Sequence, residues 1–158
     1  VSSMAEEDNG PDRAEHAEAM QTSALPPEEE PRSVANALAQ KLGIAAVWVS
    51  PEKAVFTMPV RGNTQVVGFL HGGATAALCE NAASAAANAH AWKQGKVAVG
   101  TDISVSHLRP TSDGNVTASA DATLLGRRRT VHKVAVHDER GRLIATALVS
   151  NMIVEATF

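Results

Sequence analysis

Cysteine is almost absent from this chain, which has a single one, Cys79, in 158 residues. One cysteine cannot form an intrachain disulfide, which fits a reducing compartment. Long apolar runs are also missing, since none approaches the roughly 18 residues that a membrane-spanning helix needs. The N-terminal residues lack the basic start and the apolar stretch of a secretory signal. We therefore expect a cytoplasmic protein that does not cross a membrane.

Patterns for metal, nucleotide and nucleic-acid binding are missing as well. The six histidines form no His-x-His or His-Glu-x-x-His pair and the lone cysteine has no partner, so we expect no metal site. No phosphate-binding loop or dinucleotide fingerprint occurs, and we expect no cofactor. Aromatic side chains are few, three Phe and two Trp, and no RNA-binding motif appears. A nucleic-acid partner is therefore not expected.

Acidic residues are concentrated at the N-terminal end. Residues 1–32 carry nine acidic and two basic side chains, whereas residues 33–158 carry eight acidic and twelve basic ones. A segment with clustered charge and few large apolar side chains cannot offset its ordering entropy. We expect residues 1–32 to be a disordered acidic tail, with a functional acidic arm as the alternative. Residues 33–158 are then the folded domain.

The sequence of the domain predicts a short helix, two strands, one long helix and four more strands. Ser33 could cap a helix over Val34–Leu42 that Gly43 stops. Alternation of apolar and polar residues, with a period of two, indicates half-buried strands. The expected strands are Ile44–Ser50, Lys53–Val60, Val97–Leu108, Asn115–Leu125, Thr130–His137 and Leu143–Val154.

The long helix expected over Ala74–Trp92 contains ten alanines, so its side chains are small nearly all round. A surface helix should show a strongly polar face, whereas small side chains allow a curved sheet to close tightly around a helix. The late strands are joined by hairpin-type turns, which makes them antiparallel. We therefore expect an α+β fold in which an antiparallel sheet wraps around a long central helix, the hotdog fold.

The stretch from Gly68 to Ser84 holds the strongest indication of chemistry. His71 and the pair Gly72-Gly73 precede the long helix, and Glu80 lies within it. A carboxylate on an apolar helix is costly unless it is paired, so stability alone does not explain Glu80. The glycines turn the backbone sharply and leave the first helical N–H groups bare for an oxygen that carries negative charge. This pattern predicts a carbonyl polarised at the helix N-terminus and attacked with help from Glu80.

Residues 44–154 resemble the hotdog acyl-CoA thioesterases of the phenylacetate and 4-hydroxybenzoyl-CoA type. The motif Gln65-Val-Val-Gly-Phe-Leu-His-Gly-Gly73, with Glu80 nine positions after His71, is similar to their Glu-dependent branch. The stretches Val99–Pro110 and Gly126–Arg129 are similar to enzymes that hydrolyse 1,4-dihydroxy-2-naphthoyl-CoA or proofread aryl carrier-protein thioesters. His-Gly-Gly alone would be weak, but these motifs in this order are specific.

The resemblance implies roles for five catalytic residues. Glu80 is implied to be the nucleophile or the general base on water, and either role suits thioester chemistry. The Gly72 N–H is implied to donate to the thioester oxygen, while Gln65 and His71 line the reacting centre. Ser84, four residues after Glu80 on the same helix face, is implied to orient Glu80 or the water. In this family Gln65, His71 and Gly72 come from one subunit and Glu80 and Ser84 from another.

A second group of residues is implied to bind the acyl group or coenzyme A, whose phosphates suit the guanidinium groups of arginine. A solvated charge run is the alternative interpretation of the three consecutive arginines. The implied contacts are Gly100, His107, Leu108, Arg109, Pro110, Leu124, Leu125, Gly126, Arg127, Arg128 and Arg129.

We therefore expect a homo-oligomeric acyl-CoA thioesterase, a dimer or a dimer of dimers, that needs no cofactor. The acyl group is expected to be aromatic, with 1,4-dihydroxy-2-naphthoyl as one candidate, or of medium chain length. A hydratase on the same fold and a non-catalytic acyl-CoA-binding or regulatory domain are the alternatives. The sequence leaves open the acyl group, the nucleophile or base role of Glu80, dimer or tetramer, and the role of the acidic tail.

Overall fold

The structure is a computed structural model that describes residues 36–156, so the predicted tail, residues 1–32, lies outside the described residues. Two helices, α2 (Ala37–Leu42) and α3 (Gly72–Trp92), are found in this part of the chain. Its strands are β1 (Ala45–Val49), β2 (Lys53–Pro59), β3 (Lys96–His107), β4 (Asn115–Leu125), β5 (Arg129–Asp138) and β6 (Leu143–Glu155).

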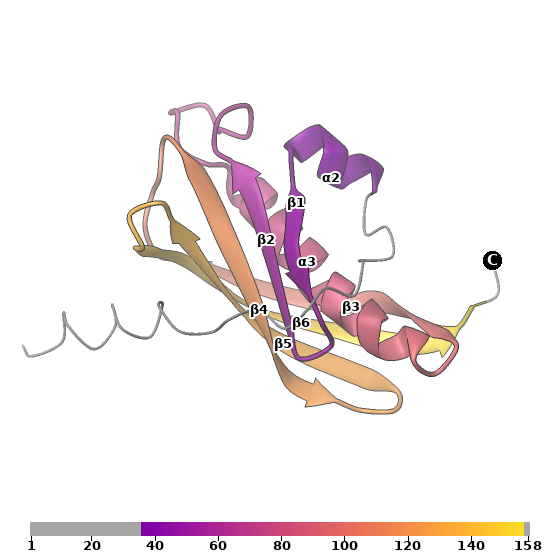
Figure 1. Cartoon of the computed structure of the whole chain (residues 1–158). Coiled ribbons are helices and arrows are strands. Elements are labelled where there is room, and N and C mark those ends of the chain that lie inside the picture. Colours follow the sequence, from indigo (N-terminus) through magenta and orange to yellow (C-terminus); the bar gives the residue numbers. More distant parts are fainter. Residues whose placement is uncertain (1–35, 157–158) are drawn as a thin grey trace, which may run out of the picture. The chain divides into compact units, whose positions relative to one another are not determined.

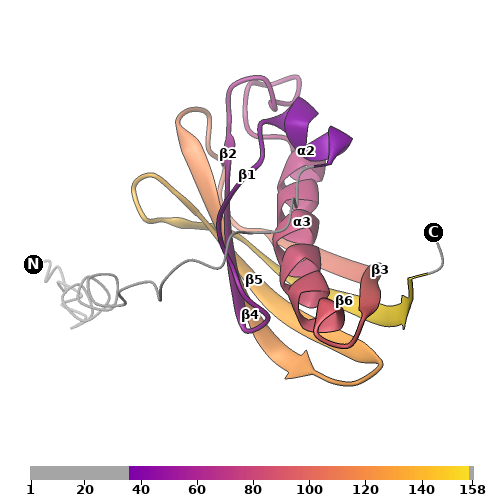
Figure 2. The same cartoon turned by 45° about the vertical axis from the view of Figure 1, so that its right-hand side comes forward.

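The strands form one antiparallel sheet in the order β1-β2-β4-β5-β6-β3. The chain leaves the sheet after β2, runs through α3, and returns at the opposite edge as β3. Figures 1 and 2 show α3 lying along one face of the curved sheet. The predicted α+β hotdog fold is confirmed.

The core lies between α3 and the inner face of the sheet. Along β4, Val116, Ala118 and Ala120 are fully buried, as the strict alternation of this strand predicts. On α3, the side chains that reach the core are mostly small, and Leu78 is the large one that is fully buried. Because alanines allow a close approach, the sheet can curve around the helix.

Both helices begin at residues that the sequence patterns did not indicate. Helix α2 starts at Ala37 and is capped by Asn36, whose side chain accepts from the Ala39 N–H at 2.9 Å, so the predicted start at Val34 with Ser33 as cap is wrong. Helix α3 starts at Gly72, two residues before the predicted Ala74. Glycine has a low helix propensity, and the cap that compensates for it is His71.

Candidate active site

The N-terminus of α3 brings His71, Gly72 and His107 together. His71 Nδ1 accepts a hydrogen bond from the Gly73 N–H at 2.8 Å and so caps the helix. Gly72 supplies the first N–H of α3, a group that has no partner within a helix. The His107 imidazole, at the end of β3, packs over Gly72, where a Cβ would lie only 2.9 Å from His107 Nε2. Glycine is therefore needed at position 72 for this close approach.

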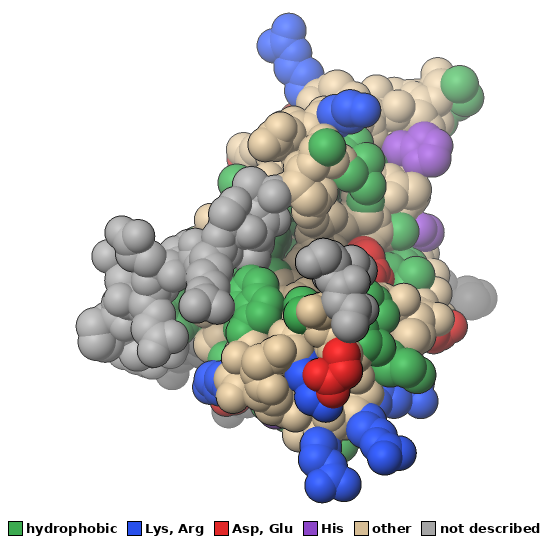
Figure 3. All heavy atoms as spheres, turned by 90° about the vertical axis from the view of Figure 1, so that its right-hand side faces the viewer, with side chains coloured by type: hydrophobic (Ala, Val, Ile, Leu, Met, Phe, Trp, Pro, Cys, Tyr) green, Lys and Arg blue, Asp and Glu red, His purple; other side chains and the backbone are tan. Residues whose placement is uncertain are grey.

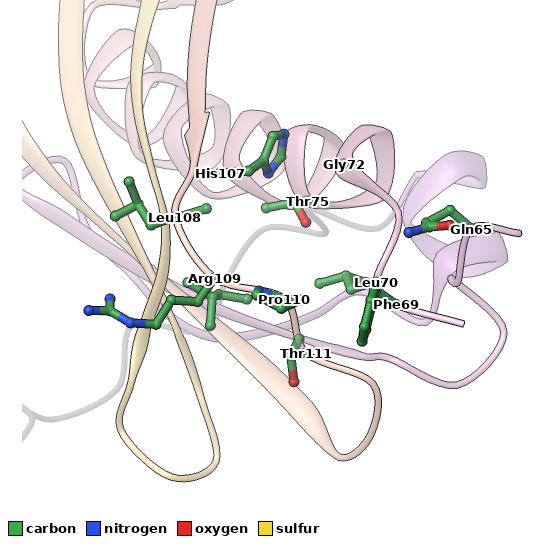
Figure 4. A pocket seen from close by; sticks show the side chains of 12 residues that line it. Gln65, Phe69, Leu70, Gly72, Thr75, His107, Leu108, Arg109, Pro110 and Thr111 are labelled. Carbon is green, nitrogen blue, oxygen red and sulfur yellow. The ribbon is translucent and has the colours of Figure 1, made fainter. Parts of the chain in front are cut away.

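A pocket of about 340 Å³ opens beside this helix end. Figure 4 shows Thr75 and His107 on the helix side of it, with Leu70 and Phe69 across the space. Its lining residues are Gln65, Phe69, Leu70, Gly72, Thr75, His107, Leu108, Arg109, Pro110, Thr111, Ile144 and Ala145. The volume lies at the lower end of the range for small-molecule sites.

Gln65 reaches this pocket from the loop that precedes α3. Its backbone N–H donates to the Phe69 carbonyl at 2.8 Å, and its side-chain Oε1 accepts from the Val67 N–H at 2.7 Å. These two bonds close a compact turn and fix the side chain of Gln65. The turn leaves Val66 and Val67 exposed to solvent.

Glu80 lies on the sheet-facing side of α3, next to Ser84 and Gly100. The Ser84 hydroxyl donates to Glu80 Oε1 at 2.9 Å, as their spacing of four residues allows. Gly100 on β3 stands against the carboxylate, and a Cβ there would overlap Glu80 Oε1. The half-buried carboxylate is therefore held between Ser84 and the backbone of β3.

The two groups of predicted catalytic residues are separated within one chain. Gly72 and Glu80 are eight residues apart on α3, which is about 12 Å along a helix axis at 1.5 Å per residue. The pocket lined by Gln65, Gly72 and His107 does not include Glu80 or Ser84. One protomer therefore presents the Gly72 N–H, predicted to polarise the carbonyl, and the Glu80 carboxylate at different places.

Cys79, next to Glu80 in sequence, is fully buried in the core. Burial raises the pKa of its thiol to about 12, so it is neutral at physiological pH. Because the thiolate is the nucleophilic form, Cys79 is a core residue and is not suited to be a nucleophile.

The residues predicted to bind coenzyme A form two groups at opposite ends of β6. His107 is paired with Ala145, and Arg129 with Met152, so about 23 Å of strand separates them at 3.3 Å per residue. Figure 3 shows one face of the molecule, with Lys and Arg side chains at both its upper and its lower end and His side chains on the right of its upper half. One protomer does not bring the two groups together.

The arginines differ in what they contact. Arg129 Nη2 donates to Ser150 Oγ at 3.0 Å and so is tied to the sheet. Arg109 extends away from the centre of the pocket (Figure 4), and its Nη1 donates to the Leu143 carbonyl at 2.8 Å. Arg127 and Arg128 are exposed in the β4–β5 turn, where the His90 ring bonds to the Gly126 carbonyl at 3.0 Å. Of the apolar candidates, Leu108 and Leu124 are half exposed.

Sequence reasoning missed three features of this region. Thr75 lines the pocket, and His107 packs on Gly72 at the N-terminus of α3, whereas the resemblance implied only that His107 contacts the substrate. Asn151 is fully buried on β6 and donates to Ser84 Oγ at 2.9 Å. A signal for Asn151 was available, because it interrupts the apolar inner face of β6 between Val149 and Ile153.

No group of three or more His, Cys, Asp or Glu side chains among residues 36–156 could hold a metal ion. Neither of the helices described is both long enough and apolar enough to cross a membrane.

Comparisons with known proteins agree with this geometry. The family model described as the thioesterase superfamily matches residues 67–145. A Deinococcus radiodurans protein named "Putative esterase" is 42% identical over 113 residues, covering 72% of this chain and 71% of the relative. The proofreading thioesterase EntH of Cronobacter sakazakii is 37% identical over 117 residues, 73% of this chain and 85% of the relative.

One solved structure is similar to this chain in both sequence and fold. The crystal structure of a thioesterase from Haemophilus influenzae superposes with a TM-score of 0.74 at 31% identity, covering 81% of this chain and 90% of that chain. These similarities are to thioesterases and esterases rather than to hydratases. The chain belongs to the hotdog thioesterase superfamily, and it is a thioester hydrolase.

Proposed function

We propose that this protein hydrolyses an acyl-CoA thioester with an aromatic or medium-chain acyl group, using Glu80 in sites shared between two copies of the chain. One observation carries the proposal. The Glu80 carboxylate, held by Ser84, faces the edge strand β3 at Gly100, while the Gly72 N–H lies in a separate pocket with Gln65 and His107. In the part of the chain that the structure describes, the Glu80 region lacks a carbonyl-polarising N–H group, and the pocket at Gly72 lacks a carboxylate.

Thioester hydrolysis needs the Gly72 N–H and the Glu80 carboxylate at the same carbonyl group. The Gly72 N–H donates to the thioester oxygen and stabilises the negative charge that develops on it, an effect usually worth about 10²–10³ in rate. Glu80 either takes a proton from water as the water attacks the carbonyl carbon, or attacks that carbon itself. The C–S bond then breaks and coenzyme A leaves as a thiolate, which takes the proton held by Glu80 on the first route and a proton from solvent on the second. On the second route the acyl group is left joined to Glu80 as a mixed anhydride. Water then hydrolyses this anhydride to the free acid and restores the Glu80 carboxylate.

The two routes differ in whether an acyl group becomes attached to the protein. Rapid acid quench during the first turnover, followed by intact-protein mass spectrometry, would show an acyl adduct on the nucleophilic route. The general-base route forms no such adduct. Substrate choice is measured with a panel of aromatic and medium-chain acyl-CoAs and free-thiol detection, and failure to turn over any of them would contradict the proposed substrate class.

The exposed edge strand β3 supports pairing with a second copy. This twelve-residue strand pairs with β6 on one side, and its apolar side chains Val99 and Ile103 are 40% and 39% exposed. Stable monomers avoid long, exposed apolar edge strands. A twofold pairing at this edge would bring a second α3 and a second pocket near Glu80.

We expect two inactive variants to complement each other if sites are shared. In a twofold dimer of Glu80→Gln with Gln65→Ala, one of the two sites carries both substitutions and the other carries neither. With free exchange of subunits, half of the dimers are hybrids, so about a quarter of wild-type specific activity should return. The measurement is thioesterase activity of the mixture over time, with each variant alone as the control.

Light scattering provides a separate check on the shared site. A monomeric species that turns over substrate at the full rate would contradict it. Absence of recovery, despite subunit exchange demonstrated by mass spectrometry, would also contradict it.

We expect Arg127 and Arg128 to recognise the phosphates of coenzyme A and not the reacting bond. Exposed charge pairs contribute up to about 1 kcal/mol, so Arg127→Ala and Arg128→Ala should each raise KM up to about fivefold while kcat changes little. A short N-acetylcysteamine thioester, which has no phosphates, should be hydrolysed equally well by variants and wild type. Arg129→Ala is the comparison, because losing its bond to Ser150 also loosens the sheet.

Equal losses on both substrates would show that the arginines support the fold or the reacting centre. The β4–β5 turn with Arg127 and Arg128 lies at one end of β6, and His107 lies at the other. We therefore further propose that a coenzyme A molecule bound by both the turn and His107 is in contact with two protomers.

A further inference from the structure

Asn151 forms the inner end of a chain of hydrogen bonds that leads to Glu80. Its Nδ2 donates to Ser84 Oγ at 2.9 Å, and Ser84 Oγ donates to Glu80 Oε1 at 2.9 Å. Asn151 is fully buried on the inner face of β6, between Gly100 of β3 and Thr130 of β5, which are its register partners. It therefore lies behind the predicted catalytic pair and away from solvent.

The direction of these bonds follows from what each group can donate. A serine hydroxyl has one hydrogen, and an ionised carboxylate can only accept. Because the Asn151 amide directs its own hydrogen at Ser84 Oγ, the hydroxyl hydrogen is free to point at Glu80. If Asn151 presented its carbonyl oxygen instead, that oxygen would compete with Glu80 for the hydroxyl hydrogen.

Asn151 is difficult to explain by stability. Its Oδ1 and the neighbouring Thr130 Oγ1 are buried and have no hydrogen-bond partner among residues 36–156. An unsatisfied buried polar atom typically costs about 1–3 kcal/mol. Its neighbours along the inner face, Val149 and Ile153, are apolar, so an apolar residue would suit this position better. The cost suggests that the amide is retained for what its donor does.

A second contact fixes the strand that faces Glu80. Asn88 on α3 accepts from the Ala98 N–H at 2.9 Å and donates to the Ala98 carbonyl at 3.2 Å. Its Nδ2 also donates to the Ser84 carbonyl at 3.0 Å. Gly100 follows two residues later, so α3 and β3 are held together just where Gly100 meets the carboxylate.

We propose that Asn151 is a positioning residue for thioester hydrolysis, which holds the Ser84 hydroxyl as a donor to Glu80 and thereby sets the angle of the carboxylate. The proposal rests on the proposed role of Glu80. Asn151 acts through Ser84 and does not touch the substrate. Its contribution is therefore to kcat, because the carboxylate must be aimed at the carbonyl carbon or the water in the transition state.

The test is Asn151→Leu, which keeps the branched shape of the side chain, removes the donor and adds some volume. Since a hydrogen bond contributes about 1 kcal/mol, kcat should fall about fivefold, with KM within about twofold of wild type. The melting temperature should stay within a few degrees of wild type, because loss of the unsatisfied Oδ1 offsets the strain of the added volume. If Asn151→Leu folds poorly by circular dichroism, Asn151→Ala is measured in its place.

A double-variant comparison separates positioning from general support of the fold. In a Ser84→Ala background, Asn151→Leu should cause no further loss of kcat, because the hydroxyl that it orients is already gone. Thr130→Val is the matched control. Thr130 is also buried and polar and is paired with Asn151 across the sheet, but it has no contact with Ser84, and valine has the same shape. This control should leave kcat unchanged.

Wild-type kcat in Asn151→Leu, or losses that multiply with Ser84→Ala, would overturn this inference. Glu80→Gln distinguishes that result from failure of the proposed function. If Glu80→Gln is inactive and Asn151→Leu is unaffected, only the role of Asn151 is wrong. If Glu80→Gln keeps its turnover, the proposed function itself is wrong.

Discussion

Glu80→Gln is expected to lower kcat by about 10²–10⁴, the range for loss of acid–base catalysis, while folding and coenzyme A binding stay nearly intact. Glutamine has the same shape, and its amide oxygen can still accept from Ser84 at the position of Oε1. It is neither a useful base nor a nucleophile, so only the chemical step should suffer. The measurements are kcat by free-thiol release, coenzyme A affinity by calorimetry and thermal unfolding.

The matched control is Glu52→Gln, which makes the same chemical change at an exposed position on the β1–β2 connection. This control should keep wild-type kcat. A Glu80→Gln protein that keeps more than about a tenth of wild-type kcat would contradict the assignment of Glu80 as nucleophile or base.

The fold was predictable because its local patterns agree with its tertiary contacts. The alternation in β4 puts Val116, Ala118 and Ala120 on one face, and that face is the buried one. The small side chains of α3 predict close packing on all sides, and the helix lies against a curved sheet. Where each residue favours the state that the whole fold requires, the sequence alone is sufficient.

The helix starts were less predictable because single contacts decide them. Gly72 and Gly73 have poor helix propensity, and histidine is not among the preferred capping residues. His71 nevertheless accepts from the Gly73 N–H, which extends α3 to Gly72. This extension makes Gly72, which lines the pocket, the first residue of α3, so it matters for the proposed chemistry.

Contacts within one helix of the candidate site were also predictable, whereas contacts between elements were not. Ser84 is four residues from Glu80, and the structure has the hydrogen bond that this spacing allows. The contacts of Glu80 with Gly100 and of Ser84 with Asn151 depend on the β3–β6 register, which shifts between Gly100 and Asp102. An irregularity of this kind leaves no clear local pattern in the sequence.

Gly100→Ala is expected to lower kcat about 100-fold with little loss of stability. The new Cβ would overlap Glu80 Oε1, and the carboxylate, as the end of a flexible side chain, can move aside. A displacement of about 1 Å from the reacting geometry can cost about 100-fold in rate. Alanine at an ordinary backbone conformation restricts the unfolded chain, so the free energy of unfolding should change by less than about 1 kcal/mol.

Lys133→Ala is the control for Gly100→Ala, because Lys133 is an exposed residue of β5, paired with Leu148 and separated from β3 by β6. It should leave kcat close to wild type. A double variant gives the decisive comparison: with Glu80→Gln already present, Gly100→Ala should lower kcat no further, because its effect is transmitted through the carboxylate. If the two losses multiply instead, Gly100 contributes through the substrate or the partner subunit. Wild-type kcat in Gly100→Ala would mean that the carboxylate does not occupy this position during turnover.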